Sequence, residues 1–207
     1  MLVLGLDSSL PLLSVALLND EGLVGAVALR GKDSRNEKLL PAVDWLLAES
    51  GIARSSIDLF AVTRGPGSFT GVRIGLATVQ GLALALDRPV CAMSTHEAVA
   101  FGAGEGVRTL VYDEAGRGEF YVSTFVGHEP LEAPRLSSAA ELESLRRSTP
   151  RVLAVQEMLR SVSVAALAAA RAHEIRMAGR LDGYVDATPI YVRLAEAEVR
   201  LQQRRDV

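Results

Sequence analysis

Hydrophobic positions in the first third of the chain come in three short runs separated by polar turn residues. The runs cover residues 2–6, 12–18 and 23–29, and the segments DSSLP and NDEG lie between them. Short apolar runs bounded by Asp, Ser, Gly and Pro are typical of β-strands. The pattern therefore predicts three consecutive strands.

The hydrophobic spacing becomes helical over residues 34–50, and Gly51 ends the predicted helix. Five apolar residues recur at a spacing of one, three or four residues and therefore form a stripe along one face of this helix: Leu39, Leu40, Val43, Leu46 and Leu47. Trp45 lies off this stripe.

A strand at 59–62, a glycine-bearing loop, a helix at 71–86 and a strand at 89–92 follow. Strands that alternate with helices in this way predict an α/β fold with a mixed sheet flanked by helices.

Beyond the GAGEG segment near Gly102, the pattern predicts a second, smaller unit. Residues 1–101 are expected to form the first lobe and residues 102–207 the second. The second lobe is predicted to contain a hairpin (109–113 with 119–126), a helix (138–147), a strand (151–155), an alanine-rich helix (162–178) and a closing extended piece with a short helix (187–200).

Composition limits the class of protein. The chain has 207 residues, 49% of them hydrophobic and 23% charged, with a formal net charge of −3, which does not suit an autonomous nucleic-acid binder. The single cysteine, Cys91, lies in an apolar run and predicts core packing in a reduced compartment. No basic leader and no uninterrupted apolar segment near the roughly 18 residues of a membrane span is evident. A cytoplasmic protein without a membrane segment is expected.

The loop GPGSFTG before the helix at 71–86 invites a test for phosphate binding. Gly67 and Gly71 enclose three residues where a Walker A loop needs four, and Val72 and Arg73 replace its Lys-Ser/Thr. The dinucleotide spacing G-x-G-x-x-G fails as well. Two interpretations remain: an anion site at the helix N-terminus, or a turn in which Ser68 or Thr70 caps the helix. The turn is favoured.

The helix at 71–86 is apolar almost all the way round, with Arg73, Thr78 and Gln80 as its polar side chains. Such a helix is buried in a core or covered by a partner. Each glycine in it costs about 1 kcal/mol relative to alanine, which implies close helix packing as compensation.

Catalytic chemistry is sparse. The three histidines are far apart in sequence and form no zinc-binding pair, and Cys91 with His96 is a weak thiol-base candidate. Asp7, Ser8 and Ser9 end the first strand and are the candidates for a residual nucleotide contact, with an Asx turn as the alternative. A charged cluster around residues 113–119 suits either a catalytic site or, preferably, a solvated hairpin.

The segments LGLDSS, TRGPGSFTGVRIGLATVQGLALAL and MSTHEAVA, with YDEAGRGEFYVSTF and PIYVR more weakly, resemble the TsaB family. That family serves threonylcarbamoyladenosine synthesis on tRNA and was formerly called glycoprotease-like. The resemblance implies two ribonuclease H-like lobes of the actin-like ATPase superfamily, the second one reduced.

The resemblance also implies a non-catalytic scaffold that activates the catalytic subunit TsaD by dimerising with it. A TsaE-like ATPase is an expected further partner, tRNA contact is indirect, and the chain alone forms a homodimer through the same surface. ATP or ADP and a metal are expected on the partner, with no cofactor, metal or catalytic residue on this chain. The expected interface comprises the stripe residues 39, 40, 43, 46 and 47 with Gly71, Arg73, Ile74, Gly75, Thr78, Gly81 and Leu82.

Two alternatives to the scaffold stay open. An independent ATP-binding ATPase or kinase of the actin-like superfamily is suggested by Asp7 and the glycine-bearing loop. A peptidase is suggested only by the old family name, and no nucleophile-base pair or metal set supports it.

Overall fold

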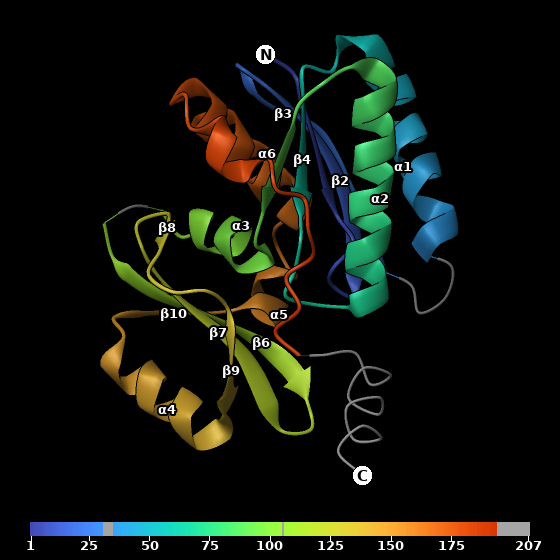
Figure 1. Ribbon diagram of the computed structural model, residues 1–207. Coiled ribbons are helices and arrows are strands. Elements are labelled where there is room, and N and C mark those ends of the chain that lie inside the picture. The colour runs from blue at the N-terminus through green and yellow to red at the C-terminus, as the bar shows by residue number, and fades with distance from the viewer. Residues whose placement is uncertain (31–34, 105, 194–207) are drawn as a thin grey trace.

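The computed structural model describes residues 1–30, 35–104 and 106–193. It contains two mixed sheets flanked by helices, as the sequence predicts (Figure 1). The elements of the first lobe are β1 (Val3–Asp7), β2 (Leu12–Asn19), β3 (Gly22–Arg30), α1 (Arg35–Glu49), η1 (Arg54–Ser56), β4 (Leu59–Thr63), α2 (Phe69–Leu86), β5 (Val90–Met93) and α3 (Thr95–Phe101).

The second lobe follows α3 and starts with a long hairpin. The predicted closing helix lies outside the described residues. The elements are β6 (Arg108–Gly116), β7 (Glu119–Val126), β8 (Glu129–Pro130), β9 (Arg135–Ser138), α4 (Ala139–Ser148), β10 (Arg151–Ala154), α5 (Val155–Met158), α6 (Val164–Met177) and η2 (Leu181–Tyr184).

The two sheets share one strand plan. The first has the order β3-β2-β1-β4-β5, in which β1 to β3 are antiparallel while β4 and β5 run parallel to β1. In the second, β6 pairs antiparallel with β7, β7 with β9, and β10 lies parallel beside β6. A helix precedes the parallel strand in both, α1 before β4 and α4 before β10. Within the described residues, the second sheet has no counterpart of β5, which makes this lobe the reduced one.

Helices cover both faces of the first sheet. On one face α1 and α2 lie side by side, and α6 packs on β1, β2 and β4 on the other (Figure 1). Gly5 in β1 permits this close approach, because a Cβ at that position would lie 2.2 Å from the carbonyl oxygen of Ala165. The alanine-rich composition of α6 therefore reflects backbone-to-backbone packing.

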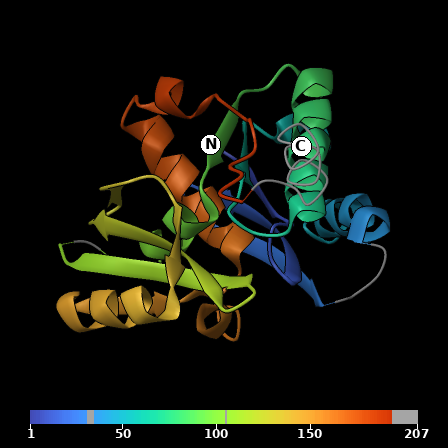
Figure 2. The ribbon, with the colours of Figure 1, turned by 60° about the horizontal axis from the view of Figure 1, so that its bottom comes forward.

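The second sheet has α4 on its outer face, while α3 and α5 pack on the face toward the first lobe (Figure 2). The expected division at residue 101 falls between α3 and β6, but α6 returns to the first sheet. Core residues of the two lobes accordingly form one continuous cluster around α6, including Val3, Val111, Phe125, Ala168 and Ile175.

The glycine-proline loop before α2 packs against the turn that follows β1. A Cβ on Gly67 would lie 2.4 Å from the carbonyl oxygen of Ser9, and a Cβ on Gly71 would lie 2.0 Å from that of Ser8. The amide of Ser68 donates to the Ser9 carbonyl at 2.7 Å. Ser68 caps α2 through its Oγ, which accepts from the amide of Gly71 at 3.2 Å. The prediction of a structural turn with a Ser68 cap is confirmed, and Thr70 is not the cap.

The 18 residues of α2 are long and apolar enough, by length and composition, to cross a membrane. A core helix of a globular protein passes the same test, and a third of this helix is buried within the chain.

His96 in α3 connects the lobes in an apolar setting. Its Nδ1 lies 2.8 Å from Oγ of Ser123 in β7, and its Nε2 is buried without a hydrogen-bond partner among the described residues. Burial lowers the pKa of His96 to about 3, because the imidazolium form loses its hydration.

We expect Gly71→Ala to lower the free energy of unfolding by roughly 1–3 kcal/mol, because the new methyl group meets backbone that cannot move freely. Gly81 lies on the exposed side of α2, where an added methyl group would enter open space, so Gly81→Ala serves as the matched control. The free energy of unfolding of Gly81→Ala should rise by up to about 1 kcal/mol, because alanine has a higher helix propensity than glycine. Urea unfolding measures both, and equal effects of the two substitutions would contradict the packing role of Gly71.

His96 should also make stability depend on pH. In the unfolded chain the imidazole binds a proton below its ordinary pKa of 6.5, whereas in the folded protein it stays neutral down to about 3, so stability falls as pH falls through this window. Between pH 7 and pH 5 the expected loss from this group is about 2 kcal/mol. His96→Asn retains a partner for Ser123 and removes the titration. Urea unfolding of both proteins at the two pH values should show a smaller loss for the variant, and identical losses would refute the assignment.

Candidate functional site

The stripe predicted on α1 faces the sheet beneath it. Leu39, Val43, Leu46 and Leu47 are buried in the core of the first lobe with residues of β2 and α2. Leu40 is the exposed member of the predicted set. The expectation that the four buried residues contact a partner directly is therefore wrong, because the helical period marks the side of α1 that covers its own sheet.

Gly71 and Gly75 on α2 are likewise buried, and they face the turn after β1. A Cβ on Gly75 would lie 2.5 Å from Oγ of Ser8. Both glycines serve packing within the chain and cannot form a partner surface, which corrects their assignment. Of the remaining predicted positions on α2, Arg73 and Gly81 are exposed, while Ile74, Thr78 and Leu82 are half-buried.

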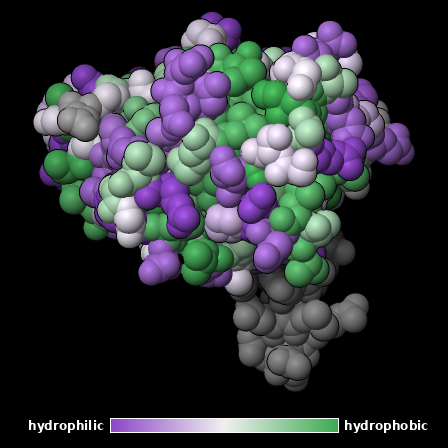
Figure 3. All heavy atoms as spheres, turned by 90° about the horizontal axis from the view of Figure 1, so that it is seen from above, coloured by the Kyte–Doolittle hydropathy of each residue, from purple (hydrophilic) through white to green (hydrophobic). Residues whose placement is uncertain are grey.

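Exposed apolar side chains on α1 and α2 define the surface that we call the helical face. Leu84 on α2 is 85% exposed and Trp45 on α1 is 56% exposed. The sequence pattern marked Trp45 as off the core stripe but gave no sign of Leu84, since α2 is apolar on every side. On the face of the molecule seen from above, Figure 3 shows hydrophobic patches separated by hydrophilic ones.

Asp7, Ser8 and Ser9 lie together between β1 and the glycine-proline loop, and all three are buried. Oδ1 of Asp7 accepts hydrogen bonds from the Ser9 hydroxyl at 2.6 Å, from the Ser9 amide at 3.2 Å and from the Thr63 hydroxyl. The Ser8 hydroxyl donates to the Gly71 carbonyl at 2.7 Å. These bonds form an Asx-type turn that holds the loop before α2.

A cleft of about 380 Å³ separates the two lobes beside this turn. Asp113 and Glu114 at the end of β6 supply its carboxylates, and no Lys or Arg is among the described residues that line it. Burial raises the pKa of Asp113, whose Oδ1 also accepts a hydrogen bond from Gln156 at 3.2 Å. In the described part of the chain, no group of three His, Cys, Asp or Glu side chains could hold a metal ion.

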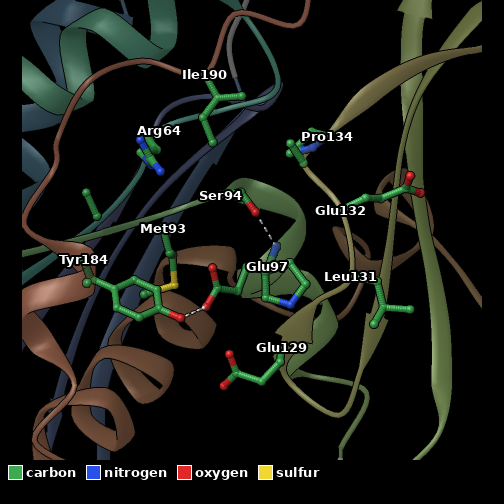
Figure 4. Close-up of a pocket in the computed structure, with 14 residues that line it drawn as sticks. Arg64, Met93, Ser94, Glu97, Glu129, Leu131, Glu132, Pro134, Tyr184 and Ile190 are labelled. Carbon is green, nitrogen blue, oxygen red and sulfur yellow. Dashed lines mark hydrogen bonds between the residues drawn. The ribbon is translucent and has the colours of Figure 1, made fainter.

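A second cavity of about 530 Å³ lies between α3, the segment after β8 and the C-terminal segment (Figure 4). Glu97 sits at its base, where Oε1 accepts hydrogen bonds from the Tyr184 hydroxyl at 2.8 Å and from Arg171 Nε at 3.2 Å. Burial raises the pKa of Glu97. Arg171 is fully buried and also pairs with Glu129 at 3.0 Å, so these charges are compensated within the protein. This cluster was not predicted from sequence, because Glu97 and Glu129, which pair with Arg171, are 74 and 42 positions away along the chain.

The remaining candidates have structural partners. Cys91 is buried in the core, and burial raises the pKa of its thiol to about 12, which confirms the packing role. His96 pairs with Ser123, as described above. Glu119, from the charged hairpin, forms an ion pair with Arg193 of the C-terminal segment.

Comparison with known proteins adds to this geometry. A family model described as TsaD, tRNA N6-adenosine threonylcarbamoyltransferase, matches residues 29–131. The tRNA threonylcarbamoyladenosine biosynthesis protein TsaB of Escherichia coli (strain K12) is 40% identical over 58% of this chain and 53% of its own length. Its counterpart in Haemophilus influenzae is 41% identical over 50% of this chain and 43% of its own length. In these alignments the chain spans about half the length of the curated relatives.

Other matches extend over the whole chain. TsaB of Bacillus subtilis (strain 168) is 28% identical over 97% of this chain and 97% of its own length. A crystal structure from Pseudomonas aeruginosa, described as an uncharacterized protein with similarity to peptidase YEAZ, superposes with a TM-score of 0.72. It is 27% identical and covers 93% of this chain and 99% of its own. The structure of YeaZ from Pseudomonas aeruginosa gives a TM-score of 0.68 at 28% identity, over 92% of this chain and 99% of its own.

These curated relatives carry the TsaB name, and the two solved structures share the fold of this chain over nearly its whole length. The resemblance to the TsaB family seen in the sequence is thereby confirmed.

Proposed function

We propose that this protein takes part in threonylcarbamoyladenosine biosynthesis on tRNA as a non-catalytic subunit in the cytoplasm. In this proposal the helical face docks on a TsaD-like catalytic subunit, which holds the nucleotide and the metal. A TsaE-like ATPase joins the complex, and tRNA is contacted only indirectly. The TsaB names of the relatives and the TsaD family model support the pathway.

The observation that carries the docking proposal is the outward side of α2. Leu84, Gly81 and Ala85 are exposed there, and Arg73 is the only charged residue in Phe69–Leu86. Covering one large aliphatic side chain contributes about 1.5–3 kcal/mol, so leaving Leu84 in water forgoes that free energy in the isolated chain. A partner that covers this side recovers it, and the small residues around Leu84 let a second helix approach closely.

A second copy of the chain could cover the same side when the partner is absent. We therefore propose a homodimer through the helical face for the isolated protein. Because an isologous dimer and the complex with the TsaD-like subunit use one surface, they compete.

Leu84→Arg and Gly81→Arg should each weaken binding to the TsaD-like subunit by roughly 10- to 100-fold, because a guanidinium then replaces apolar contact at the centre of the interface. Leu131→Arg is the matched control, since Leu131 is 55% exposed and lies in the second lobe. Calorimetric titration with the TsaD-like subunit of the same organism measures the affinities. Sedimentation of each variant alone tests the homodimer, which the two α2 substitutions should weaken and Leu131→Arg should not. If both α2 variants bind with the affinity of the control, docking occurs elsewhere.

An independent ATP-binding protein is the second candidate. It is suggested by two carboxyl groups near the cleft between the lobes: Asp113 lines the cleft, and Asp7, at the end of β1, lies close enough for its charge to raise the pKa of Asp113. The cleft disfavours a bare phosphate, because its charged lining residues, Asp113 and Glu114, are acidic and repel the negative charge of the phosphate. Oδ1 of Asp7 is also engaged by hydrogen bonds within its own turn.

We expect no heat of binding when the isolated chain is titrated with ATP and magnesium up to millimolar concentration. Asp113→Asn is the informative variant, because it removes a carboxylate and retains the geometry. Saturable binding by the wild type that is lost in Asp113→Asn would establish the second candidate and contradict the assignment of the nucleotide to the partner.

A further inference from the structure

Arg73 on the helical face is held in place by a residue from the far end of the chain. Its Nε donates a hydrogen bond of 2.6 Å to the hydroxyl of Tyr191. Its guanidinium carbon lies 3.7 Å from the centre of the Phe69 ring and 5.4 Å from that of Tyr191. The two rings are themselves in contact, with centroids 4.8 Å apart. An exposed arginine is thus fixed by two aromatic side chains.

Tyr191 can do this because the C-terminal segment is tied down on both sides of it. The amide of Ile190 donates to the carbonyl of Arg64 at 2.7 Å. Arg193 donates to the carbonyl of Ala115 at 3.1 Å and pairs with Glu119 on the second lobe. The orientation of Arg73 is therefore determined by long-range contacts that bridge both lobes.

The outer edge of the guanidinium is left available. Within the described part of the chain, the hydrogen bond of Arg73 is made by Nε, and no ion pair of Arg73 is found there, whereas Arg64 and Arg193 are each paired with a carboxylate. Nη1 and Nη2 can thus offer two parallel N–H donors to a ligand. Arginine presented in this way matches the two oxygens of a carboxylate or a phosphate.

We propose that Arg73, preorganised by Phe69 and Tyr191, binds a carboxylate of the protein that covers the helical face. The inference rests on the docking role proposed above and specifies the chemistry that the partner presents. A carboxylate is favoured over nucleic-acid phosphates, because phosphate backbones are recognised by several basic groups together. Arg73 is the single charge on an otherwise uncharged helix of a chain with net charge −3.

Preorganisation explains why the chain maintains this arrangement. A free arginine loses rotamer freedom when it forms a bidentate pair, which weakens the net attraction. Stacking on Phe69 and the hydrogen bond to Tyr191 impose that loss before the partner arrives. The pair also sits beside apolar surface, where the arrival of a partner excludes water and strengthens the interaction.

The test compares Arg73→Gln, Tyr191→Phe and Arg88→Gln in the full chain by calorimetric titration with the TsaD-like subunit. Arg73→Gln should weaken binding at least 10-fold, and Tyr191→Phe, which retains the ring but loses the hydrogen bond, should weaken it about 2- to 5-fold. Arg88 is an exposed arginine just after α2 and is the matched control, expected within 2-fold of wild type. Raising NaCl from 0.1 to 0.5 M should weaken the wild type more than Arg73→Gln.

Charge exchange gives the decisive result. Arg73→Glu should abolish binding, and replacement of one acidic residue of the partner by lysine should restore it. Wild-type affinity of Arg73→Gln, together with loss of binding in Leu84→Arg, overturns this inference while the docking proposal stands. Unchanged partner affinity with weakened tRNA binding by Arg73→Gln also overturns it, because the anion is then a phosphate. Wild-type affinity in both Arg73→Gln and Leu84→Arg overturns both proposals.

Discussion

The structure depends on one backbone-to-backbone contact, in which the loop Gly65–Gly71 lies against the turn at Ser8 and Ser9. Glycine is required there because the carbonyl oxygens of that turn occupy the space of a side chain. The contact fixes the start of α2 relative to β1, and with it the direction in which α2 presents Leu84 and Arg73. The same turn forms one wall of the cleft between the lobes. A loop that resembles a phosphate-binding loop thus serves here to pack the start of α2 against the turn of the β1–β2 hairpin.

The charged side chains between the lobes also have a structural role, although residues of these types are common in active sites. Arg171 brings Glu97, Glu129 and Glu174 together from α3, β8 and α6, and Tyr184 closes the cluster. Removing one partner from such a cluster leaves a buried charge uncompensated, which is costly. The lobes are consequently held in a defined relation across the second cavity by side chains that pair with one another.

Much of the fold was predictable from sequence, because the hydrophobic period changes clearly at β1 to β5, α1 and α2 of the first lobe and at β6, β7, α4, β10 and α6. The short elements α3, α5, β8 and β9 were missed, since two to seven residues give too little periodicity. The helical face was harder. The stripe at Leu39 and Val43 marks the core side of α1, and α2 is apolar all round, so only the tertiary structure shows that Leu84 is exposed. The contact of Arg73 with Tyr191 spans 118 positions and has no local signal.

The path of α6 has a consequence for how the protein is made. The first sheet is synthesised within the first half of the chain, yet the helix that covers its inner face comes from Val164–Met177. Until those residues leave the ribosome, the apolar side of β1, β2 and β4 has no cover from its own chain. Folding of the N-terminal lobe is therefore completed late in translation, and a nascent chain that stops before α6 exposes a sheet face to chaperones or to aggregation.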